Sequence, residues 1–237
     1  MARRPSPHAA IAVLATLGLA LPADAGVRAG FEGGLNYGKL DYVAAPALFG
    51  ESPSYRSAWC LGAVCEAPLT PHLSLVAGAR YLEYGYQSSL AVYTTGGGYA
   101  YDLRTTWRYL GVPVLLEARQ QRSRGPFLAG GFEAAYLLDV AERALVTPLA
   151  VRAAAVPAGR RAEPTGRIFE SLSPTDPLDR YRRFDLALVA GAGWSIPFRG
   201  HTLLAEVRYH HGLLDVAKSG LVEERTRGLE LLGGWRW

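Results

Sequence analysis

The sequence of 237 residues has little cysteine: only Cys60 and Cys65, both within WCLGAVCEA. In an extended strand, five residues would separate their Cα atoms by about 16 Å, whereas a disulfide needs Cα atoms within about 7 Å. An odd spacing also places the two side chains on opposite faces of a strand. We therefore expect two free cysteines, and no zinc site because no histidine adjoins them. We predict no metal site and no cofactor.

Charged residues are scarce as well, at 19%, below the roughly 25% usual in soluble domains, while hydrophobic residues reach 49%. The formal net charge of +4 is spread along the chain. The chain has no cluster of basic residues interleaved with aromatics, the pattern typical of a nucleic-acid surface. We therefore expect no nucleic-acid partner. The glycine-rich TTGGGYAYD (94–102) lacks the Lys-Ser/Thr ending of a phosphate-binding loop, and we expect a mobile surface loop there.

Long apolar runs are absent after residue 25, so no segment is predicted to span a membrane as a helix. The first 25 residues combine a basic MARRPSPH, a 13-residue apolar AAIAVLATLGLAL and a small-residue ADA before Gly26. This pattern predicts a cleaved signal peptide at 1–25. A retained membrane anchor is the alternative, but the apolar run is shorter than the roughly 20 residues that a spanning helix needs. We predict an exported chain with one domain, 26–237.

Alternation with a period of two residues fills most of that domain, and it is typical of half-buried strands. In TLLAEVRYH, apolar side chains occupy the odd positions from Leu203 to Tyr209, while Glu206, Arg208 and His210 occupy even positions. The chain also holds 27 glycines and 13 tyrosines, which suit closely spaced strands better than helices. The segments predicted as strands are 26–40, 55–69, 72–86, 101–119, 125–140, 180–198, 201–216 and 225–237.

The connections between these eight segments alternate in length. The odd-numbered ones are long (41–54, 87–100, 141–179 and 217–224) and the even-numbered ones short (70–71, 120–124 and 199–200). Long loops on one side and tight turns on the other are typical of bacterial outer-membrane barrels, which have an even number of strands. The sequence therefore predicts an all-β fold: an eight-stranded antiparallel up-and-down transmembrane β-barrel with a long external loop at about 141–179.

The polar face of the strands decides whether this barrel faces lipid. Its charges are sparse and of opposite sign, as expected for a lumen just wide enough to be filled by side chains. A soluble lipocalin-like carrier, with an apolar cavity and a polar surface, is the alternative. We favour the membrane barrel, located in the cell outer membrane. The residues predicted to form its interior polar network are Glu66, Arg80, Glu117, Glu133, Glu206, Arg208, Glu230 and Arg236.

Aromatic residues gather near the ends of the predicted strands, as in the interfacial girdles of membrane barrels. The chain itself ends on LLGGWRW, which would place Trp235 and Trp237 at the membrane boundary. Because lipid offers no water to an open sheet edge, this last strand is expected to pair with the first. The predicted girdle residues are Tyr81, Tyr84, Tyr86, Tyr99, Tyr101, Trp107, Tyr109, Trp194, Phe198, Trp235 and Trp237.

Four segments together resemble small outer-membrane barrels of the PorT-like family: WRYLGVPVLLEARQQRSRGPFLAGGFEAAYLL, FDLALVAGAGWSIPF, LLAEVRYHHGLLDV and RGLELLGGWRW. Members of that family often carry an acidic residue where Gly111 stands here. The wider family includes barrels that look like accessory parts of protein secretion. The terminal aromatic resembles the signal by which the barrel-insertion machinery recognises a last strand, which makes Trp235 and Trp237 the candidate insertion signal.

The best candidate for a catalytic site is RYHHGLLD, where His210, His211 and Asp215 would lie near the outer rim. This stretch is loosely similar to the histidine-containing rim strand of lipid A deacylase barrels, so a lipid-modifying rim enzyme is an alternative. Ser88, Ser89 or Ser219 would have to supply the nucleophile, and the two histidines point to opposite faces. We therefore predict no enzyme and no catalytic residue.

The predicted function is a structural, adhesive or envelope- and secretion-accessory role through extracellular loops. The expected partners are outer-membrane lipids and lipopolysaccharide, the insertion machinery, and an unidentified protein at the loops. Arginines of the long loop could contact anionic lipopolysaccharide, although a solvated loop explains them equally well. Those arginines are Arg152, Arg160, Arg161 and Arg167.

Overall fold

A computed structural model describes residues 26–42, 54–94, 97–121, 124–149, 167–169, 177–218 and 224–237. The predicted signal peptide, 1–25, lies outside these residues. Nine strands form one sheet: β1 (Arg28–Tyr42), β2 (Ser54–Pro68), β3 (Leu73–Thr94), β4 (Gly97–Arg119), β5 (Gly125–Leu149), β6 (Arg167–Phe169), β7 (Phe184–Phe198), β8 (His201–Gly212) and β9 (Glu224–Arg236). A short 3-10 helix, η2 (Pro177–Arg180), precedes β7. No helix in this part of the chain is long and apolar enough to cross a membrane.

Eight of the strands close into a ring in the order β1, β2, β3, β4, β5, β7, β8, β9, and β9 pairs with β1. Every pairing is antiparallel, and the three-residue β6 is added to the side of β5. The last backbone amide, that of Trp237, donates to the carbonyl of Ala29 at 3.0 Å. The prediction of an eight-stranded antiparallel barrel closed by its last strand is therefore confirmed.

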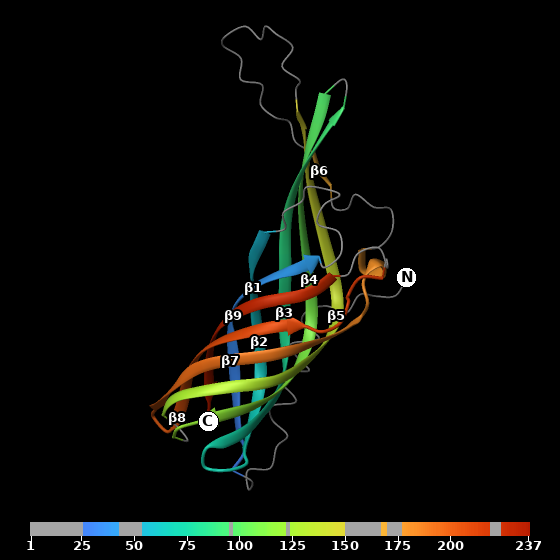
Figure 1. The fold of residues 1–237 in the computed structure, drawn as a ribbon. Coiled ribbons are helices and arrows are strands. Elements are labelled where there is room, and N and C mark those ends of the chain that lie inside the picture. The colour runs from blue at the N-terminus through green and yellow to red at the C-terminus, as the bar shows by residue number, and fades with distance from the viewer. Residues whose placement is uncertain are drawn as a thin grey trace, which may run out of the picture.

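Short turns connect the strands at one end of the barrel, where the C-terminus also lies (Figure 1). The β7–β8 turn has only two residues, Arg199 and Gly200, with φ angles of 49° and 83°. Positive φ at both positions is the requirement of a type I′ turn, whose twist matches that of antiparallel strands. We call this the short-turn end and the opposite one the long-loop end.

Three neighbouring strands are much longer than the rest and project beyond the ring at the long-loop end (Figure 1). The strands β3, β4 and β5 have 22, 23 and 25 residues, whereas β8 has 12 and β9 has 13. A barrel strand needs only about 9–11 residues to span a membrane. We call the ends of these three strands, residues 88–94, 97–103 and 144–149, together with β6, the projecting sheet.

The projecting sheet corrects two loop predictions. The expected loop at 87–100 is instead the end of a hairpin, with Thr94 opposite Gly97, and the expected loop at 141–179 begins only after β5 ends at Leu149. The glycine-rich 94–102 stretch, predicted to be a mobile loop, supplies the start of β4 from Gly97 onward. Backbone pairing with the neighbouring strand extended both segments, and glycine content alone did not reveal it.

The barrel wall has an apolar outer face and a mixed interior. On β4, Val112, Val114 and Leu116 are 45–48% exposed on the outside, while the alternate residues are buried. Both cysteines are free; Cys60 lies in the interior core and Cys65 is partly exposed. The interior itself divides into two parts, one rich in ions toward the short-turn end and one rich in aromatics toward the long-loop end.

Candidate functional site

The interior nearest the short-turn end holds two arginines around two glutamates. Arg236 donates from Nη1 to Glu66 at 2.8 Å and from Nη2 to Glu117 at 2.7 Å. Arg119 donates from Nε to Glu117 at 3.1 Å, and its guanidinium also stacks over the ring of Phe127. These residues come from β2, β4 and β9, so the cluster ties together strands on different sides of the ring.

A second cluster surrounds Arg208 of β8, and it lies farther from the short-turn end than the first cluster. Its Nε and Nη2 donate to the two oxygens of Glu206, both at 2.9 Å. Its Nη1 and Nη2 also reach the two oxygens of Glu32 on β1, at 3.1 and 3.2 Å. One guanidinium thus donates hydrogen bonds to both oxygens of each of two carboxylates, an arrangement for which the planar arginine head is suited.

The third cluster is centred on Arg80 of β3. Its Nε donates to Glu133 at 2.6 Å and its Nη1 to Glu230 at 2.8 Å, while Glu32 lies 3.7 Å away. The Nε2 atom of His210 lies 3.0 Å from both Arg80 Nη2 and Glu230 Oε2. Because Arg80 contacts strands β1, β5, β8 and β9, it crosses the lumen. We call these three clusters together the ionic half of the interior.

Glycines in the wall make room for these long side chains. A Cβ added at Gly62 would lie 2.5 Å from the Cβ of Arg80, and one at Gly191 would lie 2.6 Å from a carboxylate oxygen of Glu206. At Gly111, where the PorT-like family often carries an acid, an added Cβ would lie 2.9 Å from Glu133 Oε1. The neighbouring strand β5 therefore supplies a carboxylate next to the position where β4 lacks one.

All eight residues predicted for the polar network lie in the interior and make ion pairs. Sequence reasoning missed Glu32, Arg119 and His210 as members. The alternation itself could have found two of them, because Arg119 lies two positions from Glu117 and His210 two from Arg208. Asp185, which was also missed, lies above the clusters and accepts a hydrogen bond from the hydroxyl of Thr226 at 2.7 Å.

Toward the long-loop end the interior is filled by aromatic and aliphatic side chains. Trp107 is 1% exposed, with its ring stacked on Tyr86 at 5.2 Å and edge-on to Tyr181 at 5.6 Å. Tyr84 and Tyr109 pack edge to face at 5.8 Å in the same core. We call this the aromatic half; its main buried members are Leu82, Tyr84, Trp107, Tyr109, Leu137, Val140, Tyr181 and Val216.

The aromatic half corrects part of the girdle prediction. Tyr84, Tyr86, Trp107 and Tyr109 were expected at the lipid interface, but they pack in the interior core. On β3 and β4 these rings occupy the same alternate positions as the ionic residues nearer the short-turn end. Alternation therefore predicts the face of a side chain better than its nearness to a strand end does. By contrast, Trp194 is 54% exposed on the outer face.

Two segments between strands cover the aromatic half at the long-loop end. Tyr181 forms a bridge with Ala217, and the amide of Arg182 donates to the carbonyl of Val216 at 2.8 Å. Asp215 accepts hydrogen bonds at 3.0 Å from the amides of Ala217 and Glu224, which ties it to the first residue of β9. The side chains of Tyr181 and Val216 thereby close the lumen above Trp107.

Comparison with known proteins agrees with this architecture. A family model described as "Outer membrane protein beta-barrel domain" matches residues 20–218. The chain belongs to this family. It is an integral protein of the cell outer membrane, and by the rule of such barrels its short-turn end is periplasmic and its long-loop end extracellular. The soluble-carrier alternative is wrong. The narrower resemblance to PorT-like barrels stays a prediction.

The solved structures that match this chain are distant in sequence. Ail, the attachment invasion locus protein of Yersinia pestis, in complex with the heparin analogue sucrose octasulfate, is 9% identical with a TM-score of 0.42, covering 89% of this chain and 99% of that chain. A second structure of Ail is 10% identical with a TM-score of 0.40, covering 89% and 98%. The translocator domain of the autotransporter NalP from Neisseria meningitidis is 14% identical with a TM-score of 0.29, covering 97% of each chain. No curated protein matches the sequence.

The histidines proposed for a rim enzyme are not brought together at a rim. His210 is fully buried in the third ionic cluster, whereas His211 faces outward beside Tyr209, with the two rings 6.3 Å apart. The expectation that His210 lies near the outer rim is therefore wrong. Asp215 is occupied by backbone amides. Ser88 is buried, Ser89 is exposed on the opposite face, and Ser219 lies outside the described residues.

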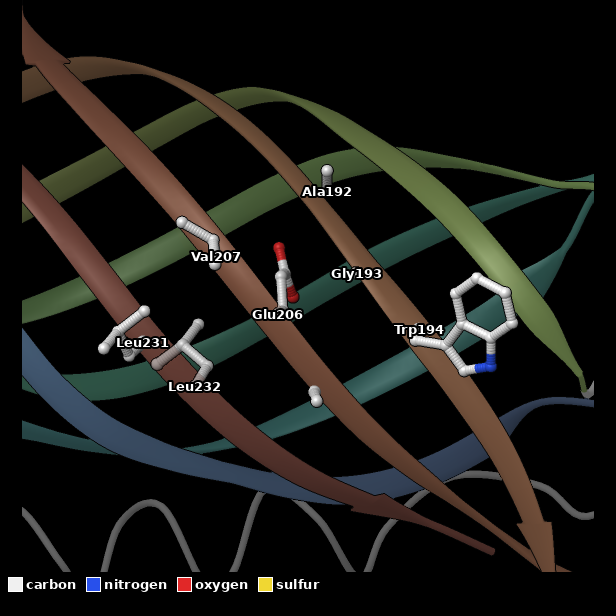
Figure 2. A pocket seen from close by; sticks show the side chains of 8 residues that line it. Ala192, Gly193, Trp194, Glu206, Val207, Leu231 and Leu232 are labelled. Atoms are coloured by element: carbon white, nitrogen blue, oxygen red, sulfur yellow. The ribbon is translucent and has the colours of Figure 1, made fainter.

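The outer wall carries a shallow depression of about 460 Å³ on β7, β8 and β9 (Figure 2). Trp194, Val207 and Leu231 border it and are 45–54% exposed, on the face that contacts lipid. Glu206 also contributes to its lining, but its carboxylate is hydrogen-bonded to Arg208 inside the barrel. The depression is thus apolar and lipid-facing.

Among the described residues no group of three metal-ligating side chains comes together.

The two tryptophans of the closing strand lie at the periplasmic, short-turn end. Trp237 is 47% exposed, and its ring centroid lies 5.3 Å from that of Phe31. Trp235 packs against Phe198 at 6.0 Å and against His201 at 5.0 Å. Both rings thus lie next to other aromatic side chains, on the first strand for Trp237 and at the last residue of β7 and the first of β8 for Trp235.

Proposed function

We propose that this outer-membrane barrel is a non-enzymatic, adhesive protein that binds partners at the cell surface through its projecting sheet. The observation that carries this proposal is the length of β3, β4 and β5, which have at least ten residues more than a membrane crossing needs. The projecting strand pairs lie beyond the ring of eight strands, so ring closure does not depend on them. They hold a rigid surface well above the lipid, as a binding element requires.

The interior supports a role for the barrel as a closed support. The ionic half and the aromatic half fill the lumen between them, and the proposed role of the eight predicted charged residues is structural. Trp235 and Trp237 are proposed as the insertion signal and part of the periplasmic girdle, with the insertion machinery as their partner. Amphipathic rings are favoured at that interface.

The test is a variant in which residues 88–103 are replaced by Asn-Gly. Gln87 and Arg104 lie opposite each other in β3 and β4, so a two-residue hairpin can join them. Cells displaying this variant should reach wild-type levels of folded barrel in the outer membrane, measured by fractionation and by the gel shift on heating. They should lose adhesion to other cells and to immobilised glycans and proteins. Full adhesion of the shortened variant would contradict the proposal.

A further inference from the structure

The outer face at the base of the projecting sheet carries three arginines in one place. Arg104 of β4 lies directly opposite Arg143 of β5, and both side chains are exposed. Residues directly opposite in an antiparallel pair have their Cβ atoms about 4.5–5.5 Å apart, and like charges there destabilise the sheet. Neither arginine has an ion-pair partner among the residues that the structure describes. An unfavourable pair of this kind needs an explanation.

A third arginine reaches the same place from β2. Arg56 donates from Nη1 to the hydroxyl of Thr106 at 2.7 Å. To do so its side chain crosses β3 at Gly85, where an added Cβ would lie 3.1 Å from Arg56 Cδ. Thr106 is two residues from Arg104 and on the same face. The glycine at position 85 thus leaves the space through which the third guanidinium joins the other two.

The acidic residues nearby are engaged elsewhere. One row closer to the membrane, Arg108 bridges Glu83 at 3.2 Å and Asp139 at 2.8 Å, so these two carboxylates are already paired. One row above, Asp102 accepts a hydrogen bond from Gln87 at 2.9 Å. The positive charge of the cluster is therefore compensated only in part by the side chains around it.

The cluster faces the outer leaflet of the membrane. The even positions of β4 from 104 to 116 share one face without interruption, and at Val112, Val114 and Leu116 that face is the exposed apolar wall. Arg104 lies four residues, about 13 Å, beyond Arg108, the first charge after the apolar stretch. The guanidinium groups are thus held just above the hydrocarbon, at the height of glycolipid headgroups, and they point away from the barrel axis.

We propose that Arg56, Arg104 and Arg143 form a binding site for the phosphate groups of the outer-leaflet lipopolysaccharide. Guanidinium groups bind phosphate oxygens in bidentate fashion, and a bound phosphate would relieve the repulsion between the opposed arginines. The site lies at the base of the projecting sheet and adds a lipid contact to it. Lipopolysaccharide binding at this site can be tested separately from adhesion. The shortened variant described above, which lacks residues 88–103, keeps all three arginines.

The binding test uses the folded full-length barrel in nanodiscs. The probes are lipopolysaccharide with its phosphates, the same lipopolysaccharide after dephosphorylation, and inorganic phosphate. Arg104→Ala combined with Arg143→Ala should weaken binding of the phosphorylated form about a hundredfold, because each lost arginine removes a charge-assisted hydrogen bond. Arg124→Ala, which removes an exposed charge at the short-turn end, is the matched control and should leave affinity unchanged. Dephosphorylation should weaken wild-type binding to the level of the double variant.

A second measurement separates binding from a merely structural role. In detergent without lipopolysaccharide, Arg143→Gln should raise the temperature of the gel shift, since it removes a like-charge pair. With phosphorylated lipopolysaccharide present, the same variant should melt below the wild type. Equal binding by the double variant, equal binding of the dephosphorylated probe, or no reversal in melting order would each overturn the proposal. Competition by millimolar inorganic phosphate would overturn the headgroup assignment and indicate a site for free anions.

Discussion

The ionic half and the aromatic half of the lumen fill the same barrel by different physical means. In the ionic half, each guanidinium crosses the lumen to carboxylates from several strands, as Arg80 does with Glu133 and Glu230. In the aromatic half, contact between large rings such as Trp107 and Tyr181 fills the space. The first half depends on charge balance, since an unpaired buried charge costs several kcal/mol, whereas the second depends on shape.

The comparison shows which surroundings favour ion pairs and which favour aromatic packing as a way to fill the lumen. The ionic residues stand among wall glycines such as Gly62 and Gly191, whose missing side chains admit long arginine and glutamate chains. The aromatic half lies under the segments of Tyr181 and Val216, whose side chains pack against it. The projecting sheet and the arginine cluster lie outside both halves, and they are the surfaces for which we propose partners.

The largest effect is expected in the ionic half, from Arg80→Met. This change leaves the carboxylates of Glu133 and Glu230 buried without their arginine. Unfolding free energy should fall by about 3–5 kcal/mol, the cost of breaking a buried ion pair from one side. The measurement is the urea midpoint of the gel shift in detergent, with Arg124→Ala as an exposed control.

A compensated variant sharpens this prediction. Combining Arg80→Met with Glu133→Gln and Glu230→Gln removes the charges together, and most of the lost stability should return. If the triple variant is as unstable as Arg80→Met alone, charge balance is not what the ionic half depends on.

In the aromatic half, Trp107→Ala should cost about 3 kcal/mol, because it leaves a cavity among Tyr86, Tyr109 and Tyr181. The loss should be the same at low and high salt, since no charge is involved. The same unfolding experiment at two salt concentrations measures it. A strong salt dependence would break the distinction between the two halves.

The segment that covers the aromatic half should respond to pH through Glu224. A strand crossing counted back from Trp237 ends at about residue 227, so Glu224 lies outside the membrane. Burial, and then the neighbouring Asp215 carboxylate, raise the pKa of Glu224 to about 7. The folded state therefore binds this proton more tightly than the unfolded state does. The stabilisation is complete below about pH 4.5 and is lost as the pH rises through about 7.

Glu224→Gln should accordingly stabilise the barrel at pH 8, on the order of 1 kcal/mol, and change little at pH 4.5. The gel-shift temperature of both proteins at the two pH values is the measurement. A variant that gains nothing at pH 8 would mean that Glu224 is charged in the folded state without cost.

The smallest effect on stability is expected at the periplasmic rim. Trp237→Ala removes the ring contact with Phe31 and should cost about 1 kcal/mol. Its effect on the amount of barrel inserted in the outer membrane should be larger, if the terminal aromatic is the insertion signal. Quantifying folded barrel in the membrane fraction checks this, and wild-type insertion would contradict that role.

Alternation in the sequence was sufficient to predict the eight strands and their closure, because a wall between lipid and lumen imposes a period of two. It placed eight charged residues on the inner face but missed Glu32, Arg119 and His210, which lie on the same face. It did not predict how far β3, β4 and β5 extend, since strand ends depend on a neighbour that offers hydrogen bonds. The aromatic half was misassigned for another reason. Aromatic rings suit both a lipid interface and a packed interior, and only the parity of Trp107 and Tyr109 separates the two.

The arginine cluster could not have been predicted from the sequence. Arg56, Arg104 and Arg143 are far apart in the chain, and their meeting depends on the register of β4 with β5 and on the space at Gly85. The same holds for the ionic clusters, where the sequence supplies the residues but not the partners. Arg80 and Glu230 are 150 positions apart.

The central claim is that the two halves fill the lumen, so that the barrel is a closed support for its external surfaces. Planar-bilayer recording of the folded wild-type protein tests this most directly. The account predicts no stable conductance steps at any moderate voltage, and none either when Trp107→Ala is combined with Tyr181→Ala, because the ionic half still fills the lumen. Steady, ohmic conductance of the wild-type barrel would contradict it.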